Sequence, residues 1–366
     1  LGSLGSTGPA LGACATFLYN LRLAVQDIRS GRARVAIVGA AEAPVVAEVM
    51  EGYAAMGALA SDKALRALDG LSDDVRPDAR RACRPFGENC GFTMSESAQI
   101  MVLFDDELAL ELGAPTLAAI PDVFVSADGP KKSISGPGIG NYVTFAKSAA
   151  LLKNLLGDRR FASGGMVQAH GTSTPQNRVT ESQIMSQVAV AMGVQKWRVG
   201  AIKSFIGHSL GAAAGDQLSA MLGVWETGLM PGITTLDGIA SDVATDRLEF
   251  ALRTEATEAP DYALINSKGF GGNNATAAVL GPNVTQELLK KHYGERKLAD
   301  WQTAHESVQI RRASMESARL EGSWAPRYHF NEGVLDPEAV EVDAAQIRLG
   351  DRTVDLSTTF PDSWQL

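Results

Sequence analysis

The chain has 366 residues, 45% hydrophobic and 20% charged, which is enough for one large core or two smaller domains. Its formal net charge of -9 argues against nucleic-acid binding through a basic surface, and no apolar run reaches the roughly 18 residues of a membrane span. The three cysteines, Cys14, Cys83 and Cys90, lack metal-site spacing and are an odd number for a disulfide framework, so we expect free thiols in a reducing cytoplasm.

The first predicted element is a helix that follows a small-residue turn containing Cys14. Apolar residues between Phe17 and Ile28 recur at spacings of one, three and four and form a single stripe, and Gly31 follows them. Residues 35–38 then read as a short strand buried on both faces, which is typical of parallel sheets. This order of elements indicates α/β architecture.

Four more buried strands are predicted, at residues 100–104, 165–169, 199–202 and 263–265. His170 follows the second of these four, Lys203 follows the third, and the glycine-rich segment 269–274 follows the fourth. Sites in open α/β sheets form beyond the carboxyl ends of strands, so each polar candidate lies where that rule places a site.

Two further patterns concern the organisation of the chain. Residues 11–15 and 210–214 resemble each other, and each segment opens a helix that a glycine closes, Gly31 or Gly228. This repeat fits a fold of two similar halves. From about residue 282 alanine and glycine become rarer and charges increase, so we expect residues 286–320 to be mostly helical, followed by irregular or strand-like segments that support packing or dimer formation.

Cys14 is the first candidate for chemistry. It precedes a helix, whose free N–H groups and partial positive charge favour a thiolate over a thiol. A thiolate in that place is a nucleophile, and a neighbouring N–H can stabilise an oxyanion. The alternative interpretation is a small buried cysteine, which is what most isolated cysteines are.

His170 and His208 are the second set of candidates, together with Lys203. Taken alone, a histidine after a strand is more often a hydrogen-bonded structural group. The combination of Lys203 and His208 around a glycine turn that opens a helix is poorly explained by packing. One cysteine and two neutral imidazoles suit thioester chemistry, because imidazole N–H groups can stabilise an enolate as a carboxylate leaves. No metal is required, and metal-ligand spacing is absent.

Four motifs carry a family resemblance: residues 12–16, 170–175, 203–215 and 269–273. In this order they resemble the signature blocks of elongating β-ketoacyl-acyl-carrier-protein synthases, over residues 1 to 281. The resemblance implies a thiolase-like fold, with duplicated α/β halves layered α-β-α-β-α. We expect this chain to hold the end of the N-terminal half and the C-terminal half, without most of the family's N-terminal half. Residues 1–281 would form the condensing domain and residues 282–366 a C-terminal α+β extension of unknown role.

The resemblance also implies roles for single residues. Cys14 would be the acylated nucleophile, His170 and His208 would bind malonyl thioester and promote its decarboxylation, and Lys203 would support the histidines. The N–H groups of Cys14 and Phe270 would form an oxyanion hole.

Further implied residues bind or brace. The Phe270 ring would gate access of the second substrate, with Gly271 in the same substrate-binding loop. Thr172 and Thr174 would hydrogen-bond the pantetheine arm, and Glu181 would brace the site. Arg178 departs from the family pattern, which has an acidic residue at that place, and indicates a divergent subgroup.

The implied activity is a decarboxylative Claisen condensation of an acyl thioester, held on Cys14, with malonyl-acyl carrier protein in fatty-acid synthesis; polyketide synthesis is a near variant. No resident cofactor is expected, because phosphopantetheine arrives on the carrier protein or on coenzyme A. The expected partners are acyl carrier protein and a second copy of the chain, in the cytoplasm. One alternative is a non-catalytic chain-length-factor-like partner, which would lack the nucleophile. Another is a non-decarboxylative thiolase, which would have a second cysteine near the glycine loop.

Overall fold

The computed structural model describes residues 5–131, 138–325, 330–332, 334 and 336–356. They form two compact units: Thr7–Gln309, and a smaller unit made of the described parts of Leu1–Ser6 and Ile310–Leu366. Every residue predicted for the site belongs to the larger unit.

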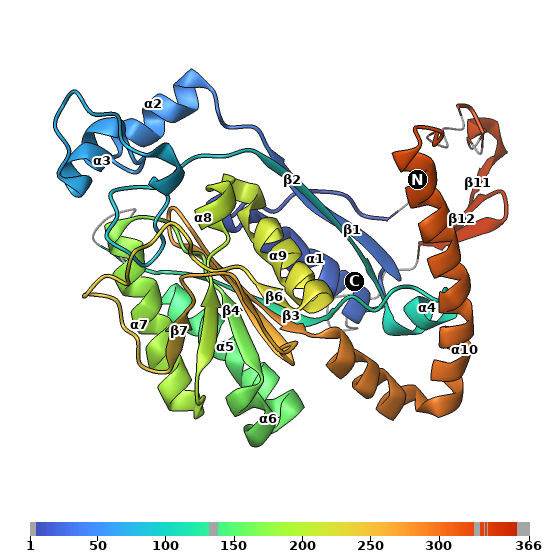
Figure 1. The fold of residues 1–366 in the computed structure, drawn as a ribbon. Coiled ribbons are helices and arrows are strands. Elements are labelled where there is room, and N and C mark those ends of the chain that lie inside the picture. Colours follow the sequence, from blue (N-terminus) through green and yellow to red (C-terminus); the bar gives the residue numbers. More distant parts are fainter. Residues whose placement is uncertain (1–4, 132–137, 326–329, 333, 335, 357–366) are drawn as a thin grey trace. The chain divides into compact units, whose positions relative to one another are not determined.

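A six-stranded mixed sheet is the centre of the larger unit (Figure 1). In spatial order its strands are β3 (Ala119–Ala127), β10 (Asn273–Leu280), β9 (Tyr262–Gly269), β4 (Gly165–Gln168), β5 (Trp197–Gly200) and β7 (Leu248–Phe250). Strands β9, β4, β5 and β7 are parallel, while β10 runs antiparallel to both β9 and β3. The strands predicted at 165–169 and 263–265 coincide with β4 and β9 and are confirmed. The strand predicted at 199–202 is present as β5, which begins two residues earlier and ends at Gly200.

Helices cover both faces of this sheet. Helices α5 (Gly140–Leu156) and α7 (Pro175–Met192) lie on one face, and α1 (Thr16–Arg29) and α9 (Ala213–Thr227) lie on the other (Figure 1). A two-stranded sheet, β1 (Val35–Glu42) and β2 (Ser97–Phe104), packs on α1 and α9. An apolar core fills the space on each face of the six-stranded sheet. These layers follow the order α-β-α-β.

The repeat seen in the sequence is also present in the structure. Short 3₁₀ turns, Ala13–Ala15 and Leu210–Ala212, lead into α1 and α9, and these two helices contact each other. The first residue of each turn, Ala13 or Leu210, has a φ of +49°, an unusual conformation for a residue with a side chain. Gly228 caps α9 in the left-handed conformation, as its position predicts.

The prediction for β1 and β2 was wrong in one respect. They pair with each other antiparallel and are not buried on both faces, since Val35, Ile37, Ile100 and Val102 are 41%, 53%, 70% and 52% exposed. An apolar run shows that a strand is suited to burial. It does not show whether another element covers each face of that strand.

The two units contain further elements. In the larger unit they are α2 (Ala47–Ala55), α3 (Asp62–Asp69), α4 (Asp106–Glu111), α6 (Asp158–Ser163), α8 (Lys203–Ile206) and the paired short strands β6 (Leu229–Met230) and β8 (Glu255–Ala256). Helix α10 (Pro282–Leu320) contains the predicted helix and has a non-helical Gly294. The smaller unit contains an antiparallel sheet of β11 (Val340–Val342), β12 (Gln346–Leu349) and β13 (Arg352–Asp355), which confirms the strand-like tail.

Candidate active site

Cys14 lies in the 3₁₀ turn at the N-terminus of α1 and is 4% exposed. The backbone N–H groups of Cys14 and Phe270 are directed at its sulfur and favour the thiolate. Ser267 on β9 donates to the Cys14 carbonyl oxygen at 2.9 Å, which fixes the turn against the central sheet. Two N–H groups that converge on one point can stabilise negative charge there.

The segment that supplies the Phe270 N–H is the tip of the β9–β10 hairpin. Gly269 pairs with Asn273, and Gly271 and Gly272 between them have φ of +84° and +90°, which favours glycine. Gly269 is needed for another reason: a β-carbon there would lie 2.3 Å from the Gly12 carbonyl oxygen. The hairpin tip therefore approaches the cysteine turn backbone to backbone.

His170 follows strand β4, and His208 lies between α8 and the second 3₁₀ turn. Their rings meet edge to face with centroids 5.3 Å apart, and the rings of Phe92 and His208 are also T-shaped, with centroids 5.1 Å apart. Both histidines are buried, and neither Nδ1 has a hydrogen-bond partner among the described residues. The structure thus brings the two histidines together.

A cavity of about 730 Å³ joins these groups. Its wall includes Cys14, His170, His208, Thr172, Thr174 and Phe270, whereas Gly271 is not part of it. The Thr172 and Thr174 hydroxyl oxygens lie 3.3 Å apart. The Phe270 ring packs against Tyr53, with centroids 6.0 Å apart.

Burial, reinforced by the Lys203 charge, holds the pKa of both His170 and His208 well below 6.5. Both imidazoles are therefore neutral near pH 7 and can donate or accept a proton. Lys203 is 2% exposed and donates from Nζ to the His170 carbonyl oxygen. Burial lowers the pKa of Lys203, and the neighbouring Glu181 charge opposes that shift.

The Cys14 thiol does not follow the expectation from its helix terminus. Burial raises its pKa to about 11, and the Lys203 charge and the two N–H groups only reduce that rise. Because desolvation of the sulfur outweighs the attraction of positive charge, Cys14 is a thiol near neutral pH. Nucleophilic attack by this sulfur would therefore require a neighbouring group that accepts its proton.

Glu181, on α7, is fully buried and accepts four hydrogen bonds. Oε1 accepts from the His170 N–H and Asn266 Nδ2, both at 2.7 Å. Oε2 accepts from the Gly171 N–H and Asn177 Nδ2, both at 2.9 Å. This carboxylate fixes the backbone of the His170 loop.

Arg178, the departure noted in the sequence, is on the same helix. Its Nε lies 2.9 Å from Asp242 Oδ1, and its Nη1 lies 3.0 Å from both Glu88 Oε2 and the Gly87 carbonyl oxygen. These pairs bind α7 to two loops and give this arginine a structural explanation.

Two contributors were not found from the sequence. Gln217 on α9 is fully buried and its amide nitrogen lies within 2.6–2.9 Å of the carbonyl oxygens of Gln168, Ala169 and Asn266. Lys268 lines the cavity and donates to Thr180 Oγ1 at 2.8 Å. Its position directly before the glycine motif was the available signal.

No cluster of three or more His, Cys, Asp or Glu suited to a metal ion occurs in the part of the chain that the structure describes. Across the same residues, no helix combines the length and apolar character needed to cross a membrane.

Comparisons with known proteins agree with the arrangement of these motifs. Residues 2–109 match the beta-ketoacyl synthase N-terminal domain, and residues 120–237 match the beta-ketoacyl synthase C-terminal domain. The chain therefore belongs to the β-ketoacyl synthase family.

Among its relatives is beta-ketoacyl-[acyl-carrier-protein] synthase FabY of Pseudomonas aeruginosa, 48% identical over 348 residues, which are 95% of this chain and 54% of FabY. A 3-oxoacyl-[acyl-carrier-protein] synthase 2 of Staphylococcus aureus is 30% identical over 75% of this chain and 63% of the relative. The crystal structure of the noncanonical ketosynthase FabY from P. aeruginosa matches with a TM-score of 0.93 and 46% identity, over 100% of this chain and 57% of that one. The predicted thiolase-like fold is confirmed. The chain spans about half the length of FabY.

Proposed function

We propose that this chain carries the condensing domain of a β-ketoacyl-acyl-carrier-protein synthase of fatty-acid synthesis. The observation that carries the proposal is that the Cys14 sulfur and two neutral histidines line one cavity, with two backbone N–H groups directed at the sulfur. The name of FabY, at 48% identity, supports the same assignment.

In the first half of the reaction, the Cys14 sulfur attacks the carbonyl carbon of an acyl thioester. The thiol proton passes to a neutral imidazole in the cavity, and the N–H groups of Cys14 and Phe270 stabilise the oxyanion. The carbon–sulfur bond to the donor then breaks, the donor thiol takes up the proton, and the acyl group remains on Cys14.

In the second half, a malonyl thioester loses CO₂, and the electron pair of the broken C–C bond forms an enolate. Hydrogen bonds from His170 and His208 to the thioester oxygen stabilise it. The enolate carbon attacks the acyl-Cys14 carbonyl, a C–C bond forms, and the C–S bond to Cys14 breaks. Cys14 is reprotonated and the β-ketoacyl thioester leaves.

The finer assignments are part of this proposal. Residues 1–281 would act as the condensing domain and residues 282–366 as an extension of unassigned role. Phosphopantetheine on acyl carrier protein would present both thioesters, with Thr172 and Thr174 against its arm. A homodimer and a cytoplasmic location complete the proposal, the latter supported by three cysteines without disulfides.

Intact-protein mass spectrometry of the full-length protein tests it. We expect one acyl adduct after incubation with acyl-coenzyme A or acyl-carrier donors, loss of the adduct in Cys14→Ala, and its retention in Cys83→Ala. Addition of malonyl-acyl carrier protein should convert the adduct to a β-ketoacyl product. An adduct that persists in Cys14→Ala, or condensation without a malonyl donor, would overturn the mechanism.

A further inference from the structure

Lys268 is a charged group in the cavity that the condensation described above does not use. It lies near the end of β9, and its ammonium group donates to the neutral hydroxyl of Thr180 at 2.8 Å. Among the described residues no carboxylate forms an ion pair with it. A desolvated cation without an anionic partner is costly, so its presence in a ligand cavity points to an anionic ligand.

The carboxylates near Lys268 are already occupied. All four hydrogen bonds to Glu181 come from other donors. Asp128 accepts from Asn274 Nδ2 at 2.7 Å and from the Gly140 N–H at 3.1 Å, and its Oδ2 lies 3.0 Å from Lys131 Nζ. The charges of Glu181 and Asp128 favour the Lys268 cation from a distance, but among the described residues neither carboxylate accepts a hydrogen bond from it.

The Lys268 charge acts on one side of the cavity. It contributes to the lowered pKa of His170, whereas the charges that act on Cys14 are those of Lys203 and Glu42, and the charge that acts on His208 is that of Lys203. Lys268 and Thr180 both line the cavity, and the Lys268 charge acts there on His170.

The two thioesters of the proposed reaction differ in charge near the reacting carbons. An acyl group is neutral there, whereas a malonyl group ends in a carboxylate. We propose that Lys268 is a substrate-positioning residue that binds the free carboxylate of the malonyl-type extender, so that the extender and not a second neutral acyl group occupies the His170 side of the cavity. This inference rests on the proposed function and extends it to selection of the extender.

The chemistry of decarboxylation predicts how this contact affects the rate. As CO₂ leaves, negative charge moves from the carboxylate to the enolate oxygen at the histidines. The contact with Lys268 is then strongest before reaction and weakens in the transition state, so its loss should raise KM for the extender without lowering kcat.

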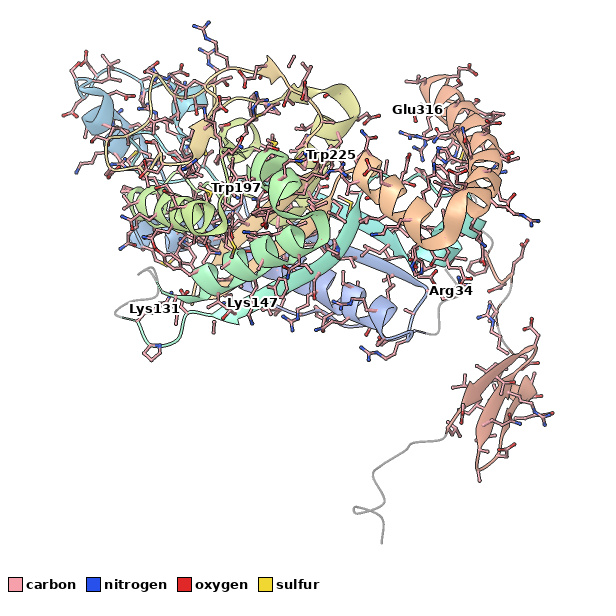
Figure 2. All side chains as sticks on the ribbon, turned by 90° about the horizontal axis from the view of Figure 1, so that it is seen from below. Arg34, Lys131, Lys147, Trp197, Trp225 and Glu316 are labelled. Carbon is pink, nitrogen blue, oxygen red and sulfur yellow. The ribbon has the colours of Figure 1, made fainter. Side chains whose placement is uncertain are left out.

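The test uses the full-length protein and two pantetheine amides, malonyl and acetyl, whose amide nitrogen replaces the thioester sulfur. The wild type should bind the malonyl amide more tightly than the acetyl amide. Lys268→Met should weaken malonyl binding by about tenfold to a hundredfold and leave acetyl binding unchanged. Lys268→Arg should restore the preference, because it keeps the charge. Lys147→Met is the matched control: Lys147, labelled in Figure 2, is an exposed lysine on α5 outside the cavity.

Kinetics on the same proteins separate the two proposals. Lys268→Met should raise KM for malonyl-acyl carrier protein without lowering kcat, while acylation of Cys14 remains at the wild-type rate and shows that the protein is folded. The role of Lys268 would be overturned if the wild type showed no preference for the malonyl amide, or if Lys268→Met kept the same preference. This holds whether or not the protein catalyses condensation. Selective malonyl binding without a condensation product would overturn the proposed function alone.

Discussion

The carbonyl oxygen of Gly12 occupies the space next to Gly269 so closely that a β-carbon on Gly269 would lie 2.3 Å from it. These residues are far apart in the sequence, yet their contact directs the Phe270 N–H towards the Cys14 sulfur. The proposed oxyanion donors thus depend on one position where no side chain fits.

Gly269→Ala should therefore separate the hairpin from the cysteine turn and slow acylation of Cys14 by about a hundredfold, the cost of losing one oxyanion donor. Single-turnover acylation, followed by mass, measures the effect. Gly223→Ala is the control, since a β-carbon at that helical position meets no atom within 4 Å. Equal acylation rates in Gly269→Ala and the wild type would show that this contact does not position the donor.

Lys203→Met should move the acid limb of malonyl decarboxylation to higher pH. The Lys203 charge helps to keep the pKa of His170 and His208 well below 6.5, so its removal lets both rings take up protons at a higher pH. The wild-type rate should fall only well below pH 6.5. A pH–rate profile from pH 4.5 to 8 checks this, with Lys147→Met as control, and an unshifted limb would contradict it.

The same shifts predict how stability depends on pH. A histidine has a pKa near 6.5 in the unfolded chain, whereas the pKa of the buried rings is lower, so below about pH 6.5 the unfolded chain binds more protons. The free energy of unfolding should fall as the pH drops below about 6.5. His208→Gln, which has no such proton to bind, should lessen that decline in urea titrations at several pH values.

Periodicity predicted α1, β4 and β9 because each has an apolar pattern that matches its buried surface. It could not show what covers β1 and β2, since a pattern does not identify the packing partner. The position of Cys14 before a helix predicted a favoured thiolate, but depth of burial is a property of the folded chain, and burial determines the direction of its pKa shift. Lys268 was missed because a lysine at a strand end usually points into solvent.

The pH dependence of Cys14 alkylation shows whether burial or the helix N-terminus determines the pKa of the thiol. With a pKa of about 11, the thiolate fraction should increase with pH through the accessible range, so the rate with iodoacetamide should rise up to pH 9.5 without a plateau. Peptide mass spectrometry resolves Cys14 from the half-buried Cys90. A plateau near neutral pH would show that the helix terminus and Lys203 outweigh desolvation.

Glu181→Gln should destabilise the protein and the His170 loop together. Two donors face each carboxylate oxygen, so an amide in either orientation sets its own N–H₂ against two of them. Unpaired buried groups cost about 1–3 kcal/mol each, so we expect a loss of at least about 2 kcal/mol in the free energy of unfolding. Urea unfolding measures it, and the exposed Glu316→Gln, labelled in Figure 2, should leave the transition nearly unchanged.

Tyr262→Phe should lower stability without affecting the chemistry. The Tyr262 hydroxyl accepts from Trp197 Nε1 and donates to the Phe161 carbonyl oxygen, both at 2.8 Å, and all three side chains are fully buried. Phenylalanine keeps the stacking on the Phe161 ring but leaves the indole N–H without its acceptor, at a cost of about 1–3 kcal/mol. Thermal unfolding of Tyr262→Phe, Trp197→Phe and the double variant measures the interaction between the two side chains. We expect a coupling free energy of at least about 0.5 kcal/mol. Strictly additive changes would show that the hydroxyl and the indole do not stabilise each other. Acylation of Cys14 should remain at the wild-type rate, because neither Tyr262 nor Trp197 lines the cavity.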